Sequence, residues 1–552
     1  MVRMNMKLFF RCILSLAICL SGLKQTLCQQ ENSQDKSAFY KDLPFKMKEV
    51  KQPVFNSYIV KLTDFGAKND GITSNTKAFA EAISVVVAKG GGTVLIPEGL
   101  WLTGPIELKS NVRLNTEKGA IVLFTRNYDE YPMVKTWYEG QNCWRTMSPI
   151  YAKDAENIAI TGQGLFNGNG DAWRPVKMGN VSEALWRKFN SSGGVINDKG
   201  TSWYPTEGAL KGSKMTISPG QRSEKESEDI KVFLRPVMVN LVNCKKVLLD
   251  GVTFQNSPAW CLHPLMCENI TVSNVIVKNE EWAANGDAID LESCRNALIY
   301  NSSFDAGDDG ICMKSGKDEE GRKRGVPTEN VIIFNCTVYN GHGGFVVGSE
   351  MSGGVRNILV KHCSFIGTDN GLRFKSTRGR GGVVENIYIS DINMVNIEKD
   401  AILYDLYYMT RDGKKETHVA DESTPQFKNI FMKNIICKGA DRAILFQGLP
   451  EMTLKNIYLE NAVIEARTGV FFSDADKITM KNVQVFTKEL PVIDIKNATN
   501  IEVENFSYHK IAGTIFTVSG EKTDKIHYIN ANVTGGNLKV GSEVKEGAVI
   551  LQ

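Results

Sequence analysis

The chain has 552 residues, of which 42% are apolar, 49 are glycine and 12 are cysteine, and its formal net charge is +3. Length alone suggests three or four domains, but no linker rich in Pro, Ser or Gly and no low-complexity tract follows residue 57. The composition therefore favours one long folded domain, at 57–552, with a large apolar core.

The N-terminal segment at 1–28 has the pattern of an export signal. Three cations precede an apolar stretch at 12–23, which is too short to span a bilayer. We expect cleavage near Cys28, an N-terminal extension at 29–56, and export to the periplasm, the cell surface or the medium, with no integral membrane span. Acylation of Cys28 is the alternative, and Leu27 argues against it because a small residue is expected there.

Charge and cysteine content argue against nucleic acid as a partner and against a metal site. Removing 1–28 takes away four cations and no acid, so the formal charge changes from +3 to about −1. This argues against nucleic acid, which requires an extended basic surface. Nine cysteines remain, without Cys-x-x-Cys pairs or His clusters, and several, such as Cys336 and Cys363, occupy equivalent positions of a repeat. We expect stacked core thiols, and neither a metal site nor a cofactor.

A helix is predicted near the start of the domain. Residues 73–75 (TSN) are candidate caps for a helix at about 76–89, which ends at the triple glycine 90–92. A helix at this place would cover the open end of a stacked sheet, which otherwise invites aggregation.

From residue 157 onward the chain repeats a short unit, in which Asn precedes an alternating apolar run and a second small or polar residue follows. Such units start at Asn157, Lys246, Asn269, Asn296, Asn330, Asn357, Asn386, Asn429, Asn456, Lys477 and Asn500. The period of two indicates strands, and Asn suits the bends because it tolerates left-handed dihedral angles.

One strand-turn-strand unit cannot bury its apolar face alone, so successive units must stack. We therefore expect an all-β fold, a single right-handed parallel β-helix with an N-terminal capping helix. A leucine-rich horseshoe would need a Leu-rich consensus with helices, and a β-sandwich would need frequent hairpin turns. The sequence has neither pattern.

Four polar motifs fall in successive repeats. They are Asn285-Gly286-Asp287 with Asp290, Gly307-Asp308-Asp309-Gly310, Gly341-His342-Gly343-Gly344 and Arg373-Phe374-Lys375. Their offsets from the repeat starts agree once 317–327 is treated as an inserted loop. We therefore expect these side chains on successive coils, about 4.8 Å apart per coil.

The motifs together are an inventory for glycoside hydrolysis, which needs a protonated carboxyl and a carboxylate that activates water. We expect mutual repulsion to raise one pKa of the Asp308-Asp309 pair. Arg373 and Lys375 point to one face and form a two-pronged site for a sugar carboxylate, within a local cluster that includes Arg378 and Arg380. Each motif alone has a simpler interpretation: a solvated Asp-Asp-Gly turn, an exposed His or a basic strand.

The chain resembles glycoside hydrolase family 28, the polygalacturonases and their relatives, in the motifs "NGDAID", "GDDG", "GHGG" and "RFK" and in the entry segment from Asp64. The resemblance covers 57–552. It implies hydrolysis of α-1,4-galacturonosidic bonds in pectin or polygalacturonate with inversion at the anomeric carbon. It also implies a pectic polysaccharide or oligogalacturonide as the binding partner, and we expect a monomer.

The resemblance also implies roles for individual residues. Asp308 would be the general acid, Asp287 and Asp309 would position and deprotonate water, and His342 would orient the acid. Substrate would be bound by Asn285, Arg373, Lys375 and Tyr407, with Tyr408 as the alternative tyrosine. Many relatives have Asp-Asp-Cys where this chain has Asp309-Gly310, which puts their local disulfide in doubt although Cys312 is near.

Long insertions favour exo-action from the non-reducing end. A segment at 168–229 and an aromatic-rich segment from Met133 are absent from short endo-acting members, and with "STRGRGG" they look similar to bacterial exo-acting members. Insertions beside a solenoid can wall off a groove so that only chain ends enter. The simpler interpretation is that Trp173, Trp203 and Tyr204 pack a surface loop.

Three alternatives remain open at this stage. The enzyme would act on galacturonic linkages in rhamnogalacturonan or a substituted pectin if its subsite loops differ. A pectate β-elimination would need a calcium site, which the clustered Asp residues could mimic. A non-catalytic carbohydrate-binding β-helix, such as an adhesin or a tailspike, should lack the co-stacked Asp, His and Arg-Lys motifs.

Overall fold

The computed structural model describes residues 36–410, 416–509 and 513–552. The predicted signal peptide at 1–28 therefore lies outside the described residues. The chain divides into two compact units, Met1–Glu49 and Val50–Gln552. The described part of the first unit contains one short helix, η1 (Lys36–Tyr40).

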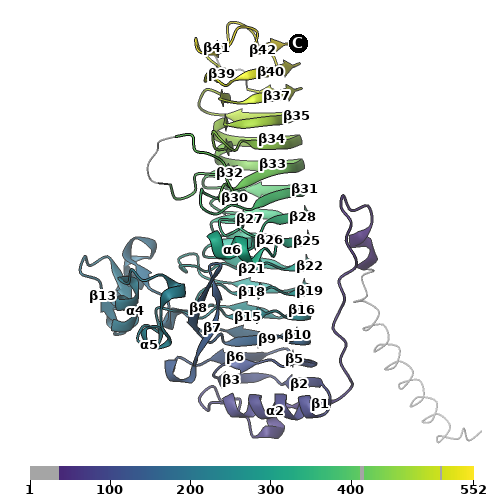
Figure 1. Cartoon of the computed structure of the whole chain (residues 1–552). Coiled ribbons are helices and arrows are strands. Elements are labelled where there is room, and N and C mark those ends of the chain that lie inside the picture. Colours follow the sequence, from purple (N-terminus) through teal and green to yellow (C-terminus); the bar gives the residue numbers. More distant parts are fainter. Residues whose placement is uncertain (1–35, 411–415, 510–512) are drawn as a thin grey trace, which may run out of the picture. The chain divides into compact units, whose positions relative to one another are not determined.

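The second unit is a parallel β-helix, as predicted, and its coils are stacked in sequence order (Figure 1). It begins earlier than residue 57, because the backbone N–H of Lys51 donates to Asn269 Oδ1 (3.1 Å) and Gln52 donates to Thr271 Oγ1 (2.6 Å). Each coil contributes strands to three parallel ladders. In the described ranges, no helix is both long and apolar enough to cross a membrane.

The first ladder follows the repeat units found in the sequence. It contains β1 (Ile59–Lys61), β2 (Gly92–Ile96), β5 (Val112–Thr116), β10 (Glu156–Gly162), β16 (Lys245–Asp250), β19 (Glu268–Ser273), β22 (Arg295–Tyr300), β25 (Thr328–Phe334), β28 (Val355–Lys361), β31 (Val383–Val395), β33 (Gln426–Gln447), β34 (Leu454–Ser473), β35 (Ala475–Thr487), β37 (Thr499–Glu504), β40 (Asp524–Ile529) and β42 (Val549–Leu551). The long strands β31 and β33 to β35 bend and continue into the other ladders.

The second ladder follows the first across the Asn bend. It contains β3 (Gly99–Thr103), β6 (Ala120–Phe124), β11 (Leu165–Asn167), β17 (Thr253–Gln255), β20 (Ile276–Lys278), β23 (Ser303–Ala306), β26 (Thr337–Asn340), β29 (Ser364–Ile366) and β38 (Ser507–Tyr508).

The third ladder carries the polar motifs. It contains β4 (Ile106–Glu107), β9 (Ile150–Lys153), β15 (Val239–Val242), β18 (Leu262–Leu265), β21 (Ile289–Glu292), β24 (Asp309–Lys314), β27 (Gly343–Gly348), β30 (Leu372–Lys375), β32 (Asp400–Asp405), β36 (Ile493–Lys496), β39 (Phe516–Ser519) and β41 (Leu538–Val540). Its register pairs Cys312 with Val346 and Val346 with Arg373, so the four motifs do lie on successive coils.

Asparagine columns hold the bends. Asn296, Asn330 and Asn357 all have φ near +57°. Asn330 donates to Asn296 Oδ1 (3.3 Å) and Asn357 donates to Asn330 Oδ1 (3.1 Å). A second column includes Asn482 and Asn505, joined at 3.0 Å. Each amide therefore satisfies its neighbour one coil away while its backbone adopts the left-handed conformation that Asn tolerates.

The predicted helix is α2 (Thr76–Ala88), which covers the N-terminal end of the coils (Figure 1). Its face of Phe79, Ile83 and Val86 is buried in the solenoid core. Asn75 stands at the N-cap position, yet its side chain does not cap the helix. Instead its amide bonds to Lys68 and to Leu102 O, which fastens the helix start to the first coils.

The core thiols also match the prediction. All nine cysteines of the described residues are buried and free. The backbone N–H of Cys244 donates to Cys267 Sγ (3.3 Å), and that of Cys267 donates to Cys294 Sγ (3.4 Å), as expected for thiols stacked on neighbouring coils. Cys312 forms no disulfide.

Three loop regions depart from the simple coil. Strands β7 (Met133–Tyr138) and β8 (Gln141–Thr146) form an antiparallel hairpin. The segment between β11 and β15 forms a small sheet of β12 (Val176–Lys177), β14 (Ser202–Tyr204) and β13 (Val195–Ile196), with α3 (Glu183–Ser191), α4 (Glu207–Ser213) and α5 (Glu224–Glu228). The predicted loop at 317–327 contains α6 (Asp318–Arg324). Single-turn helices are η2 (Leu62–Phe65), η3 (Tyr128–Glu130), η4 (Gly170–Ala172), η5 (Met178–Asn180) and η6 (Pro219–Gln221).

Candidate active site

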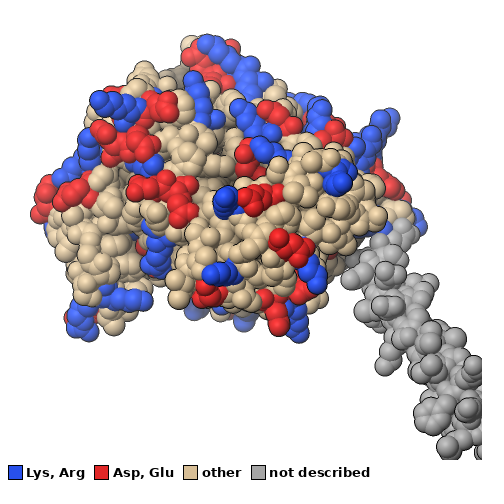
Figure 2. Space-filling model, turned by 90° about the horizontal axis from the view of Figure 1, so that it is seen from below, with Lys and Arg blue, Asp and Glu red and all other residues tan. Residues whose placement is uncertain are grey.

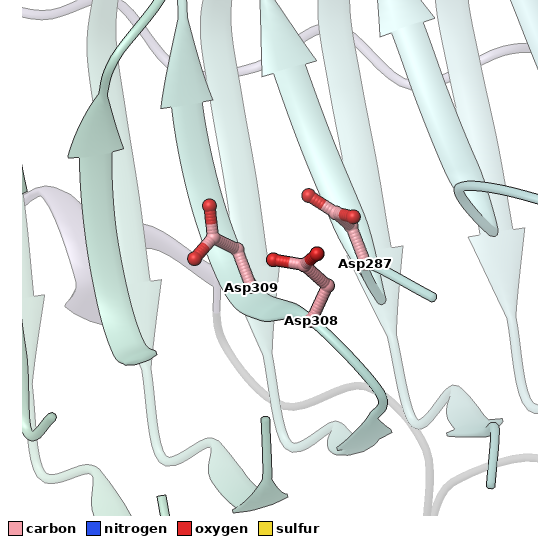
Figure 3. Close-up of side chains that lie close together, drawn as sticks. All are labelled: Asp287, Asp308 and Asp309. Carbon is pink, nitrogen blue, oxygen red and sulfur yellow. The ribbon is translucent and has the colours of Figure 1, made fainter. Parts of the chain in front are cut away.

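The three carboxylates of the Asp motifs meet where strands of the third ladder begin. Asp287 lies just before β21, Asp308 just before β24, and Asp309 is the first residue of β24. In Figure 3 the three side chains lie close together, with Asp287 on one coil and Asp308 and Asp309 on the next. One oxygen of each lies within 4.8 Å of the others. Residues separated in sequence are thus brought together by the stacking of coils.

Asp309 is held in its charged form. Its Oδ2 accepts from Lys375 Nζ (2.6 Å) and its Oδ1 accepts from the guanidinium of Arg373 (2.9 Å), and both cations are largely buried. Burial would raise the pKa of Asp309, but Lys375 and Arg373 outweigh it and hold this pKa below its ordinary range. In the unliganded protein these two cations are partners of Asp309.

The pKa values of Asp287 and Asp290 are raised, in contrast to that of Asp309. Burial raises the pKa of Asp287 well above its ordinary value, and the nearby charges of Asp290 and Asp308 add to the effect. Burial likewise raises the pKa of Asp290 to about 8, although Lys314 opposes it from 3.5 Å. We expected repulsion within the Asp308-Asp309 pair to raise one of its pKa values. For Asp309 this is wrong, because its two cations dominate, and the raised carboxyls lie one coil earlier.

His342 is the partner of Asp308. Its Nδ1 lies 2.9 Å from Asp308 Oδ1, and its backbone N–H donates to Asp308 O (2.7 Å). The hydrogen bond with Asp308 raises the pKa of His342 above its ordinary value. The neighbouring Gly341 has φ +80°, and a Cβ there would lie 2.3 Å from Asp308 O. A glycine is therefore required for the two loops to approach this closely.

The site lies in a cavity of ≈ 340 Å³. Of the predicted residues, it is lined by Asn285, Asp287, Asp308, Asp309 and Lys375. His342, Arg373 and Tyr407 do not line it. Seven further lining residues had no role predicted from the sequence: Glu139, Trp260, Lys314, Lys317, Ser349, Glu350 and Met409. Two more lining residues had been named without a firm role, Arg380 as part of a cation cluster and Tyr408 as the alternative tyrosine.

The tyrosine at the cavity is Tyr408 rather than the expected Tyr407. The ring of Tyr408 lies 5.1 Å from Lys375 Nζ and 5.7 Å from the Arg373 guanidinium. Tyr407 packs against the core and stacks with Arg378, which is bound to Glu451. The two tyrosines are adjacent in sequence, so an error of one residue in the alignment after β32 is enough to select the wrong one.

A buried ion pair between Lys314 and Glu350 lies at the cavity. Lys314, at the end of β24, lies 3.2 Å from Glu350 Oε2 and 4.7 Å from the ring centre of Trp260. Burial would raise the pKa of Glu350, but Lys314 and Arg380 outweigh it and lower this pKa to about 2. Lys314 directly follows the apolar run Ile311–Met313 in the same strand as Asp309. A lysine at this place was the sequence signal that could have predicted a buried ion pair near the site.

The hairpin β7–β8 forms one wall of the cavity. Its turn residue Glu139 lines the cavity, and the backbone N–H of Asn142 donates to Glu320 Oε1 in α6 (2.8 Å). Tyr138 packs on Trp260 with ring centres 4.5 Å apart. The hairpin from Met133 therefore borders the site, as expected for a wall, whereas no residue of the segment 168–229 lines this cavity.

Trp173, in that second insertion, is a packing residue. It is fully buried between Tyr128 and Tyr131, with ring centres 4.8 and 5.0 Å away. Trp203 is buried against Phe189. The simpler interpretation of these aromatic residues as loop packing is therefore correct for Trp173.

Arg235 fixes the loop that carries the first motif. Its guanidinium donates to Ala284 O (2.7 Å), Pro258 O (3.1 Å) and Asn285 Oδ1 (2.7 Å). Asn285 has φ +52°, so its side chain turns back from the bend toward Arg235. The position of Asn285 at the cavity is thus set by a residue from the end of the long insertion region.

The ion pairs of Asp309 predict the pH dependence of activity. An acid whose folded pKa is depressed stays ionised until the pH falls through that low value. In Arg373→Gln one cation is lost, so the pKa of Asp309 should rise and the acid limb of kcat/KM should move to higher pH by about 1 unit or more. The measurement is kcat/KM against pH, with Arg378→Gln as control. An unmoved limb in Arg373→Gln would contradict the assignment of Asp309 as the ionised base.

A parallel β-helix with clustered carboxyls at a cavity on its third ladder is the arrangement expected of a glycoside hydrolase, and comparisons with known proteins agree. Residues 186–469 match the model of glycosyl hydrolases family 28, and residues 59–179 match the model described as rhamnogalacturonase A/epimerase, pectate lyase-like. The chain belongs to glycosyl hydrolases family 28.

Individual relatives cover most of the chain. A probable polygalacturonase of Vitis vinifera is 26% identical over 420 residues, which are 74% of each chain. An exo-poly-alpha-D-galacturonosidase of Dickeya chrysanthemi is 27% identical over 404 residues, which are 71% of this chain and 64% of that one. The crystal structure of an exopolygalacturonase from Thermotoga maritima is 32% identical, covers 80% of this chain and 94% of its own, and superposes with a TM-score of 0.68.

Proposed function

We propose that this protein hydrolyses α-1,4-galacturonosidic bonds of polygalacturonate and pectin, acting from the non-reducing end of the chain. The observation that carries the proposal is the pairing, in one small cavity, of an ionised carboxylate, Asp309, with a second carboxyl, Asp308, that is bonded to His342. The similarity to a Thermotoga exopolygalacturonase at 32% identity supports both the substrate and the exo mode.

In the proposed reaction Asp308 gives its proton to the departing glycosidic oxygen. Asp308 is the more exposed member of the carboxylate group, and His342 orients it. Asp309 takes the proton from the attacking water, because Arg373 and Lys375 keep it ionised. Asp287, whose pKa is raised by burial, helps to position the water.

Recognition of the galacturonate carboxylate falls to the cations that reach the cavity. Lys375 and Arg380 line it, and Arg373 shares with Lys375 the bond to Asp309. Asn285 and Tyr408 supply polar contacts at the cavity wall. This set keeps the expected roles of Asn285, Arg373 and Lys375 and replaces Tyr407 by Tyr408.

The size and walls of the cavity favour exo-action. A volume of ≈ 340 Å³ is at the low end of the range of about 300–1,000 Å³ for small-ligand sites. The hairpin β7–β8 and the α6 loop meet at the Asn142–Glu320 bond and close one side. An enclosure of this kind admits the end of a chain and obstructs its passage. Export after cleavage near Cys28 would place the enzyme with its polymeric substrate.

The test is incubation of the mature chain with defined galacturonate oligomers in the presence of a chelator, with products resolved over time. We expect galacturonate monomer alone from the earliest time points. A ladder of intermediate oligomers would replace exo-action by endo-action, and unsaturated products would replace hydrolysis by β-elimination. A chain that cleaves rhamnogalacturonan or substituted pectin but not these oligomers would support the alternative substrate.

The stereochemical outcome is a separate prediction, because two criteria disagree. Carboxyl oxygens within 4.8 Å are nearer to the separation of about 5–5.5 Å in retaining enzymes than to the 6.5–9.5 Å of inverting ones. We propose inversion, because Arg373 and Lys375 hold both oxygens of Asp309 and keep this carboxylate from moving onto the anomeric carbon, while each oxygen retains a lone pair for a proton of water. NMR spectroscopy of the first product should show the β-anomer. An initial α-anomer would show that the enzyme retains configuration.

A further inference from the structure

A second cavity, here called the side cavity, lies between the solenoid and the insertion at 168–229. Its volume is ≈ 720 Å³. One side is the apolar floor of the insertion, formed by Leu185, Phe189, Trp203 and Pro205. The rest of the lining is mostly polar, with Asn167, Asn256 and Glu280 from the solenoid and Asn169 from the start of the insertion.

The polar wall is pre-organised. Arg174, fully buried, donates to Asn256 Oδ1 (2.5 Å), Ser257 O (2.9 Å) and Glu280 Oε2 (2.9 Å). Asn169 donates to Phe124 O (2.7 Å). These bonds fix the directions of the amide and carboxylate groups before any ligand arrives, which reduces the ordering cost of binding.

One loop separates the side cavity from the catalytic cavity. Within 279–287, Glu280 and Trp282 line the side cavity, whereas Asn285 and Asp287 line the catalytic cavity. Trp282 is half-buried, with its ring edge-on to Phe189 at 5.5 Å. A ligand in the side cavity would therefore lie beside a substrate in the catalytic cavity, across a single turn of chain.

Most charged groups of the side cavity are paired. Arg126 is paired with Asp171 (2.8 Å), and Glu280 with Arg174 (2.9 Å). Lys188, the other lining cation, is exposed on α3. These pairs favour a neutral ligand over a carboxylate, for which the lining offers only the exposed Lys188.

An apolar floor together with a fixed wall of amides and carboxylates matches the two kinds of surface on a sugar ring, its C–H face and its rim of hydroxyls. Trp282 adds an aromatic edge, and aromatic side chains are the usual large contacts in such sites. We propose that the side cavity binds neutral sugar units, so that a neutral branch of a pectic chain is held beside the cleavage site. The link to a branched substrate rests on the proposed function, whereas the sugar binding itself does not.

The experiment measures binding of galactose and arabinose tetrasaccharides to the full chain by tryptophan fluorescence, with tetragalacturonate as the acidic counterpart. We expect the neutral tetrasaccharides to bind and Trp282→Ala to weaken their binding at least about fivefold. Trp186→Ala, a change in the same insertion outside the side cavity, is the matched control. Leu185→Arg is a second variant, which fills the floor from α3 and leaves the sequence of the loop at 279–287 unchanged.

Hydrolysis of unbranched galacturonate oligomers by Trp282→Ala and Leu185→Arg should remain at the wild-type rate. If either folded variant loses that hydrolysis, the side cavity is part of the galacturonate site and the proposal is overturned. It is equally overturned if neutral tetrasaccharides fail to bind the wild-type chain, or bind all variants equally. Neutral-sugar binding in a chain that hydrolyses no galacturonate would uphold the side cavity and reject the proposed function.

Discussion

Asp308→Asn is expected to lower kcat by about 10²- to 10⁴-fold, the usual contribution of a general acid or base. The amide keeps the size of the carboxyl and can still bond to His342, but it has no proton of the required acidity to give to the leaving oxygen. Asp308 is partly exposed, so the substitution should not disturb the packing of the coils. The measurement is the initial rate of galacturonate release at saturating oligomer.

Asp305→Asn is the matched control for this change. Asp305 lies in β23 of the same coil and bonds to Asn340, outside the catalytic cavity. Its variant should keep the wild-type rate. If Asp308→Asn remained active while Asp287→Asn did not, the role of general acid would pass to Asp287, whose pKa is raised by burial.

Lys314→Met is expected to lower the free energy of unfolding by about 3–5 kcal/mol, the range found when one partner of a buried ion pair is removed. Lys314 is almost completely buried and lies 3.2 Å from Glu350 and 3.5 Å from Asp290. Without it, Glu350 would keep its charge in a poorly solvated place or take up a proton. Chemical denaturation followed by circular dichroism measures the change.

The low pKa of Glu350 gives this prediction a pH signature. A carboxyl with a folded pKa of about 2 stabilises the fold above its unfolded pKa, and that stability is lost as the pH falls toward 2. Removing Lys314 should raise the folded pKa, so the variant should lose less stability on acidification than the wild type. Lys481→Met, at an exposed pair with Glu504, should leave the unfolding midpoint nearly unchanged. Equal effects of the two substitutions would refute the buried-pair interpretation.

The stacking of the site residues was predictable because the distance of each motif from its repeat start can be measured along the sequence. Once the bends at Asn296, Asn330 and Asn357 are recognised, the offsets of the motifs place Asp287, Asp308 and His342 on neighbouring coils. The capping helix was predictable for a similar reason, since its signals at 73–75 and 90–92 are local. These inferences use distances along the chain that the fold preserves.

The electrostatics of the site were not predictable from the same pattern. The charge of Asp309 depends on which of several cations lies within 3 Å, and Lys375 and Arg373 reach it from two coils further on. The choice between Tyr407 and Tyr408 depends on a single residue of register after β32. The wall at Glu139 comes from a hairpin far earlier in the sequence, and no periodic signal connects it to the motifs.

The surface charge is consistent with the interpretation drawn from composition. On the face seen in Figure 2, Lys and Arg side chains alternate with Asp and Glu, and no continuous basic area appears. We expect the attraction for an acidic substrate to come from the cations at the catalytic cavity, such as Lys375 and Arg380, and to weaken as ionic strength rises.

The asparagine columns make the positions of the coils independent of the loops that border the cavities. Because each bend is bonded to the bend above it, the height of every coil is set on the side of the solenoid away from the loops that border the cavities. Loops such as 133–146, and 168–229 provided that Arg174 is kept, can therefore be exchanged between related enzymes without displacing the catalytic carboxylates. This makes the scaffold suitable for engineering new glycan specificities by loop grafting, with the hydrolytic centre kept intact.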